Sequence, residues 1–102
     1  MWRNHWRWWL KVNRALIDVV DVVMLWLLRW RMVFCRRIGR VKRRHGLPIY
    51  VPEREQQVLK QRAAIGRRFE FEDTFIITLA TAIMTESKRL QKGEVKWTPQ
   101  SS

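Results

Sequence analysis

Residues 15–28 read ALIDVVDVVMLWLL, a run that is apolar at every position except Asp18 and Asp21. Neither glycine nor proline occurs between residues 2 and 37. Polar side chains recur there at intervals of three and four residues, which is the spacing of one stripe along an α-helix. The stripe consists of Arg3, Arg7, Lys11, Arg14, Asp18 and Asp21. The spacing predicts one long helix over about residues 2–37, and its apolar middle section must be covered by other molecules.

Prolines and glycines mark the end of this helix and the start of a second one. Six cations crowd into residues 36–44, and the glycine within that run suggests that the helix ends nearby. Pro48 and Pro52 each restrict the preceding residue to extended geometry, so residues 38–51 are predicted to be a basic loop and a connector. Pro52 suits the first turn of a helix that is predicted over about residues 52–65 and stops at Gly66.

A third helix has both start and stop signals. Asp73 or Thr74 is the expected N-cap, and an apolar body follows it with helical spacing. Cations occupy the last turns, and Gly93 lies just beyond them. These signals predict a helix over about residues 73–92.

The sequence therefore predicts a mainly α fold that forms one structural unit. The alternation of residues 69–72, FEFE, leaves room for a minor two-strand pairing with residues 49–51. The predicted segments are a long helix (1–37), the basic loop and connector (38–51), a two-helix segment (52–93) and a tail (94–102). A chain of 102 residues fits one domain at most.

Basic residues outnumber acidic ones, and the excess lies in the first half of the chain. There are 21 Lys and Arg against 9 Asp and Glu, which gives a net charge of +12. Residues 1–51 hold 12 basic and 2 acidic side chains, so 12 − 2 gives this half a net charge of +10. Such a surplus indicates contact with an anionic partner. The predicted RNA-binding and anion-binding residues are Arg3, Arg7, Arg36, Arg37, Arg40, Lys42, Arg43 and Arg44.

Tryptophans alternate with arginines at the N-terminus. Flat aromatic rings stack on unstacked RNA bases, and arginine binds the phosphates beside them. The residues predicted to stack on bases, or to form an interface, are Trp2, Trp6, Trp8 and Trp9. Two alternatives remain for the same rings, namely packing against protein and lying at a membrane interface.

Residue types that carry out catalysis are scarce in this sequence. His5 and His45 are the two histidines, and the arginines around them disfavour both a protonated imidazole and a bound cation. Cys35 is the single cysteine, so it forms no internal disulfide and has no suitably spaced histidine to make it a nucleophile. Asp18 and Asp21 are expected to pair with cations. We therefore expect no catalytic residue, no metal and no cofactor.

These features together favour a non-catalytic structural subunit of a large ribonucleoprotein. The N-terminus has cations on one helical face and no acid before Asp18, which is typical of mitochondrial presequences. The expected assembly is therefore the mitochondrial ribosome in the matrix. The expected partners are rRNA and several protein subunits, with no small-molecule substrate.

Two other classes of protein compete with this hypothesis. One is an accessory subunit of a mitochondrial inner-membrane complex, of the respiratory-chain or ATP synthase type, with the long helix at or in the membrane. The 14 apolar-rich residues 15–28 are too few for a simple span, which needs about 20. The other is a free-standing enzyme or regulator, which is the weakest of the three because recognisable catalytic motifs are absent from the sequence.

Overall fold

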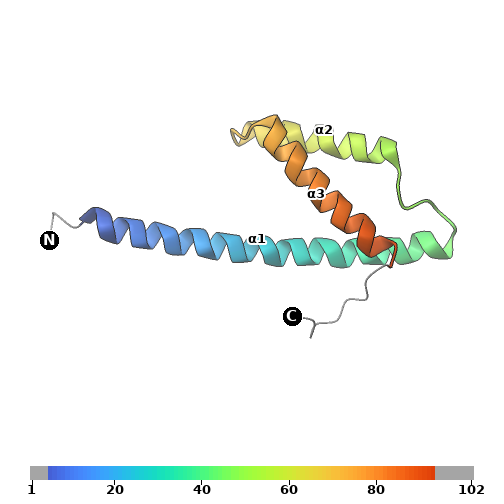
Figure 1. Cartoon of the computed structure of the whole chain (residues 1–102), viewed down its shortest axis with the longest axis horizontal. Coiled ribbons are helices and arrows are strands. Elements are labelled where there is room, and N and C mark those ends of the chain that lie inside the picture. Colours follow the sequence, from blue (N-terminus) through green and yellow to red (C-terminus); the bar gives the residue numbers. More distant parts are fainter. Residues whose placement is uncertain (1–4, 94–102) are drawn as a thin grey trace. The chain divides into compact units, whose positions relative to one another are not determined.

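The computed structural model describes residues 5–93, and these residues form three α-helices. They are α1 (His5–Arg44), α2 (Pro52–Arg68) and α3 (Asp73–Gln91), as Figure 1 shows. The prediction of a mainly α fold with one long helix and two shorter ones is confirmed. The predicted pairing of residues 49–51 with 69–72 is wrong, because neither range forms a strand.

The first helix continues past the point where the sequence predicts its end. Residues 38–44 belong to α1, so this part of the basic segment is helical and not a loop. Gly39 does not terminate the helix but lies buried against α3. A Cβ atom at Gly39 would lie 2.7 Å from the Cα atom of Gln91, closer than such atoms ever pack. The glycine is therefore needed for helix packing and is not a stop signal.

The second helix also contains a glycine that permits close packing. Pro52 is the first residue of α2, as predicted, but the helix continues past Gly66 to Arg68. An added Cβ at Gly66 would lie 2.5 Å from Cγ1 of Ile76 on α3, so the missing side chain lets the two helices approach. The backbone N–H of Phe71 donates to the Gly66 carbonyl at 2.9 Å and closes the turn after the helix.

The third helix begins at Asp73, as predicted, but its N-cap is neither Asp73 nor Thr74. Glu72 occupies the N-cap position with extended backbone, and Asp73 is the first helical residue. The Asp73 carboxylate pairs with the Arg67 guanidinium at 2.9 Å, which ties the end of α2 to the start of α3. Both side chains are largely exposed, so this ion pair contributes little to stability.

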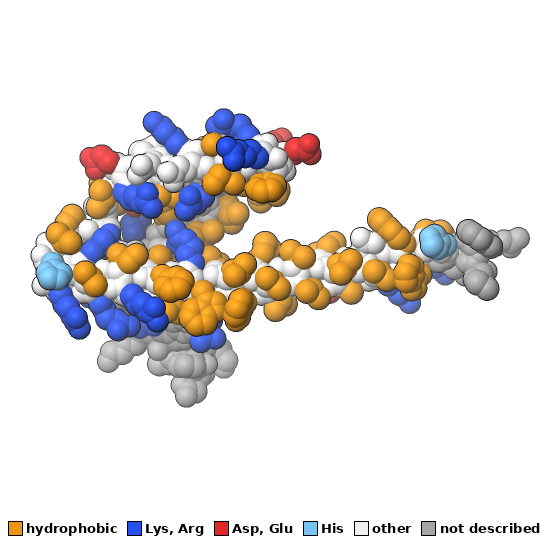
Figure 2. Space-filling view, turned by 180° about the vertical axis from the view of Figure 1, so that it is seen from behind, with side chains coloured by type: hydrophobic (Ala, Val, Ile, Leu, Met, Phe, Trp, Pro, Cys, Tyr) orange, Lys and Arg blue, Asp and Glu red, His pale blue; other side chains and the backbone are white. Residues whose placement is uncertain are grey.

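The contacts divide the chain into two units between Arg31 and Met32. In the first unit, the large apolar side chains from Leu16 to Leu27 are between 47% and 66% exposed. Figure 2 shows these hydrophobic side chains on the surface of α1. Within residues 5–93, none of the helices has the length and the apolar character that a membrane span requires.

The second unit contains a small core. Its buried apolar side chains are Met32, Val58, Ala63 and Met84, from all three helices. Two polar side chains, Ser87 and Gln91, are buried with them. Buried polar groups are normally hydrogen-bonded, so these two side chains are candidates for a functional site.

Candidate active site

The buried face of α3 ends in two polar residues. Ala80, Met84, Ser87 and Gln91 recur at intervals of four, three and four, so they share one face of the helix. Ser87 is 4% exposed, and its hydroxyl donates to the Ile83 carbonyl at 2.9 Å. Gln91 is 8% exposed, and its Oε1 atom is buried without a hydrogen-bond partner among the described residues. A buried acceptor of this kind indicates that a ligand or a water supplies the missing donor.

The end of α1 brings a cation to the same place. Because Gly39 has no side chain, the α1 backbone passes close to that of Gln91. One turn further along α1, an Nη1 atom of Arg43 donates to the backbone carbonyl of Gln91. The guanidinium carries five N–H donors in all, so further donors remain for an anion.

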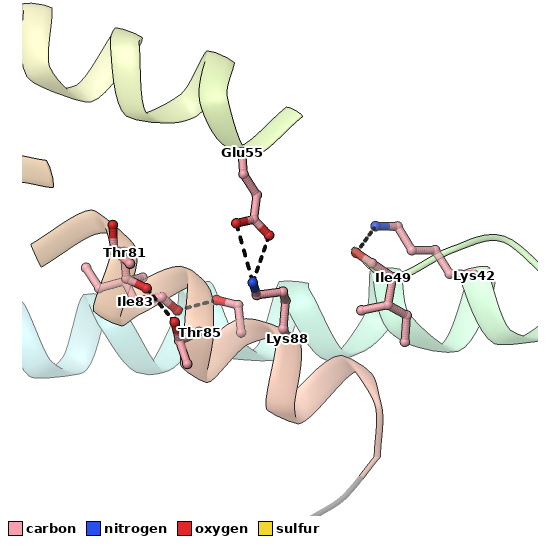
Figure 3. Close-up of polar contacts among 8 residues, drawn as sticks. Lys42, Ile49, Glu55, Thr81, Ile83, Thr85 and Lys88 are labelled. Carbon is pink, nitrogen blue, oxygen red and sulfur yellow. Dashed lines mark hydrogen bonds and ion pairs between the residues drawn. The ribbon is translucent and has the colours of Figure 1, made fainter. Parts of the chain in front are cut away.

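Two lysines contact the connector between α1 and α2. Lys42 Nζ on α1 donates to the carbonyl of Ile49 at 3.4 Å (Figure 3). Lys88 Nζ on α3 lies 4.6 Å from the ring centroid of Tyr50, the next residue of the connector. The two ammonium groups therefore contact consecutive residues of the connector.

The first turn of α2 supplies a carboxylate. Glu55 points from α2 toward Lys88 on α3, and Figure 3 shows both of its oxygens facing the ammonium. Lys88 Nζ lies 3.0 Å from Oε2 and 3.4 Å from Oε1. The two side chains are only 27% and 23% exposed, so this pair is more strongly coupled than a surface ion pair.

We call these side chains the polar cluster. It consists of Lys42, Arg43, Glu55, Ser87, Lys88 and Gln91. Its three cations and one anion leave a formal charge of 3 − 1 = +2. Ammonium and guanidinium groups, together with an unpartnered amide oxygen, suit a small anionic ligand that also carries a hydrogen-bond donor. Among residues 5–93, side chains of His, Cys, Asp and Glu do not gather in a group of three that would hold a metal ion.

A second carboxylate of α3, that of Glu86, is already paired with a cation. Glu86 binds the Arg89 guanidinium through two hydrogen bonds of 2.6 and 2.7 Å. The hydrogen bond from Arg89 holds the pKa of Glu86 below its ordinary value, and the charge of Arg89 acts in the same direction. Glu55 is therefore the carboxylate that bears on the polar cluster.

Of the predicted anion-binding residues that lie within the described range 5–93, two belong to the polar cluster, Lys42 and Arg43. Their bonds to Ile49 and Gln91 place them in the polar cluster. The other cations of the set that the structure describes lie elsewhere on α1, and they are Arg7, Arg36, Arg37, Arg40 and Arg44. Arg3 lies outside the described residues.

Three of the predicted aromatic residues belong to the first unit, near the start of α1. Trp6, Trp8 and Trp9 are exposed in the first unit, with the Arg7 guanidinium 5.2 Å from the centroid of the Trp6 ring. Trp2 lies outside the described residues. A stacking or interface role for these rings stays a prediction.

Sequence reasoning missed four members of the polar cluster, which are Glu55, Ser87, Lys88 and Gln91. Glu55 lies in the first turn of α2 and Lys88 in the last turn of α3, where the helix dipole alone accounts for an acid and a base. One signal was available for the other two. Ser87 and Gln91 continue the helical spacing of an apolar stripe. A polar residue in such a stripe is expected to be buried, which indicates a hydrogen-bonding or ligand-binding role.

Comparison with known proteins identifies the family. The family described as "Chorismate mutase type II" matches residues 13–92, a range that contains the whole polar cluster. A 4-amino-4-deoxychorismate mutase of Streptomyces pristinaespiralis is 36% identical over 78 residues, which cover 76% of this chain and 60% of that protein. A T-protein of Enterobacter agglomerans is 39% identical over 74 residues, which cover 72% of this chain and 20% of that protein.

A third relative is closer to this chain in length. The 4-amino-4-deoxychorismate mutase of Streptomyces venezuelae is 32% identical over 78 residues, which cover 76% of either protein. In contrast, this chain spans less than two thirds of the length of each of the first two relatives. No solved structure matches the chain at a comparable level of significance.

These matches correct the functional hypothesis drawn from composition. A non-catalytic, rRNA-binding subunit of the mitochondrial ribosome is wrong, and so is an accessory subunit of an inner-membrane complex, because the matching family is one of enzymes. The expectation of RNA partners and no small-molecule substrate is wrong because the family is named for a small molecule. The expected mitochondrial location stays a prediction. Since the match covers residues 13–92, the chain belongs to the chorismate mutase type II family.

Proposed function

We propose that this chain is a mutase that isomerises chorismate, or a close analogue of it, in the polar cluster. The observation that carries the proposal is the family match over residues 13–92, which includes every residue of the cluster. The buried, unpartnered Oε1 atom of Gln91, a residue whose backbone carbonyl binds Arg43, supports the same location.

The charge of the cluster suits such a substrate. Chorismate is a dicarboxylate, and the formal charge of +2 on the cluster balances its two negative charges. Lys42 has three N–H donors and uses one of them on the Ile49 carbonyl. Arg43 uses one of its five N–H donors to bind the Gln91 backbone carbonyl. It can present two other N–H donors to a carboxylate in a bidentate manner. These two residues are the proposed carboxylate-binding groups.

The chemistry of a mutase explains why recognisable catalytic motifs are missing from this sequence. A mutase rearranges one molecule, so the reaction needs no second reactant and no covalent nucleophile. Rate enhancement then comes from holding the substrate in a reactive geometry and from stabilising the charge that develops in the transition state. Gln91 can accept a hydrogen bond from the substrate at Oε1, while nearby cations stabilise negative charge.

The proposal is tested by adding chorismate to the purified chain and following the loss of its ultraviolet absorbance. The wild-type chain should convert chorismate with saturable kinetics. A charge-assisted hydrogen bond is worth about 1.5–3 kcal/mol, so Lys42→Met should lower kcat/KM by about tenfold to a hundredfold. Lys60→Met is the matched control, because Lys60 is exposed on α2 and lies outside the cluster.

Two results would contradict the proposal. A folded wild-type chain that converts neither chorismate nor its 4-amino analogue would reject the activity. Equal losses in the Lys42→Met and Lys60→Met variants would reject the polar cluster as the place of reaction.

A further inference from the structure

Lys88 and Glu55 form an ion pair within the polar cluster. Lys88 Nζ contacts both oxygens of the Glu55 carboxylate, at 3.0 and 3.4 Å. The Tyr50 ring lies on another side of the same ammonium, 4.6 Å away. About three quarters of each charged side chain is shielded from water, so solvent screens the pair only in part. Lys88 therefore neutralises the one carboxylate of the cluster.

The relatives are named for two substrates that differ in charge. The two Streptomyces proteins are named for 4-amino-4-deoxychorismate, in which an amino group replaces the hydroxyl on carbon 4. The family to which this chain belongs is named for chorismate itself. An alkyl amine is protonated near neutral pH, as the lysine side chain is. The amino compound thus carries one positive charge that the hydroxyl compound lacks.

The charges of Lys88 and Glu55 discriminate between these two molecules, because the two substrate carboxylates already balance Lys42 and Arg43 in either complex. Like charges repel in a partly dry site, so the Lys88 ammonium disfavours a cationic substituent. A free carboxylate would attract it, but the carboxylate of Glu55 is already paired with Lys88. This argument needs only the charge of the substituent and not its exact position in the site.

We propose that Lys88 is a specificity-determining residue that makes this enzyme prefer the 4-hydroxyl substrate over its 4-amino analogue. The inference rests on the proposed function, because it concerns the substrate of the same site. Removing the Lys88 ammonium frees the Glu55 carboxylate, lowers the formal charge of the cluster from +2 to +1, and favours the amino substrate.

The test is the ratio of kcat/KM for chorismate to kcat/KM for 4-amino-4-deoxychorismate. Both values come from one protein preparation, so the ratio does not depend on how much of a variant is folded. The wild-type ratio should exceed one. Lys88→Met should shift the ratio about tenfold toward the amino substrate, which corresponds to about 1.4 kcal/mol.

Two further variants separate the role of charge from that of structure. Lys88→Arg keeps the positive charge and should keep the ratio near its wild-type value. The double variant Lys88→Met with Glu55→Gln removes both charges, so the shift caused by Lys88→Met alone should disappear. That double variant also leaves no unpaired carboxylate, which protects the fold from the cost of a stranded charge.

Failure of this inference can be told apart from failure of the proposed function. A wild-type preference for the amino substrate would overturn the inference, as would a Lys88→Met ratio within twofold of the wild type, while the proposed function would stand. If the wild type converts neither compound, dissociation constants measured by calorimetry replace kcat/KM. An unchanged ratio of those constants, or no binding of either compound, would overturn the inference as well.

Discussion

Replacing Gln91 with methionine should make the protein more stable and less active. Methionine is unbranched and adaptable, and it removes the amide whose Oε1 atom is buried without a partner. A buried unsatisfied polar group costs about 1–3 kcal/mol, while an apolar group of the same shape avoids that cost. We expect Gln91→Met to raise the free energy of unfolding by about 1 kcal/mol. For a chain of this size, that gain raises Tm by about 4–8 °C.

The same substitution should damage the reaction. If the Oε1 atom accepts a hydrogen bond from the substrate, the loss of that bond lowers kcat/KM by about tenfold or more. Stability is measured by urea unfolding followed by circular dichroism, and activity by conversion of chorismate. Gln61→Met is the matched control, because Gln61 is an exposed residue of α2, and it should change neither quantity appreciably.

Opposite signs for stability and activity are the distinctive result of this experiment. A Gln91→Met variant that is less stable than the wild type would mean that the amide is fully satisfied in the folded protein. A variant that is more stable but fully active would mean that the buried acceptor has no part in the reaction. Either outcome refutes the argument for Gln91.

Two more predictions follow from the contacts around Gln91 and from the Glu86–Arg89 pair. Gly39→Ala gains about 1 kcal/mol of helix propensity but places a Cβ atom 2.7 Å from the Gln91 Cα atom, and overpacking costs about 1–3 kcal/mol. We expect a net loss in urea unfolding together with lower activity, and a more stable variant would contradict the packing. Arg89 lowers the pKa of Glu86, so the stability from this pair is present above the ordinary glutamate pKa and is lost as the pH falls through the lowered value. In an NMR titration, Arg89→Gln should raise the pKa of Glu86, and an unchanged pKa would exclude the pairing.

The helices can be predicted from the sequence because their signals are local. Pro52 is the first residue of α2, and Asp73 is the first residue of α3. Gly39 and Gly66 give the wrong ends, because a glycine that permits close packing looks the same in sequence as a glycine that ends a helix. The two roles of glycine differ in whether the residue contacts another helix, here α3, and a local sequence pattern does not contain that information.

The polar cluster could not be predicted because it depends on contacts between distant parts of the chain. Lys88 meets Glu55 from another helix, and Gln91 meets Arg43. Each of these residues has an ordinary local explanation at a helix end or on a basic surface. The large surplus of cations and the tryptophans indicated an RNA-binding protein instead. A site that works by position and charge leaves no short motif to correct that hypothesis.

The most direct test of the polar cluster is the NMR signal of the Gln91 side-chain amide during a titration with chorismate. An active chain converts part of the added chorismate during the titration, so the site is occupied by substrate in some molecules and by product in others. Both compounds carry the carboxylates that the cluster should bind. We predict that the Gln91 amide signal moves in a saturable manner, while the exposed Gln61 amide stays in place. A saturable shift elsewhere with an unmoved Gln91 signal would contradict the account.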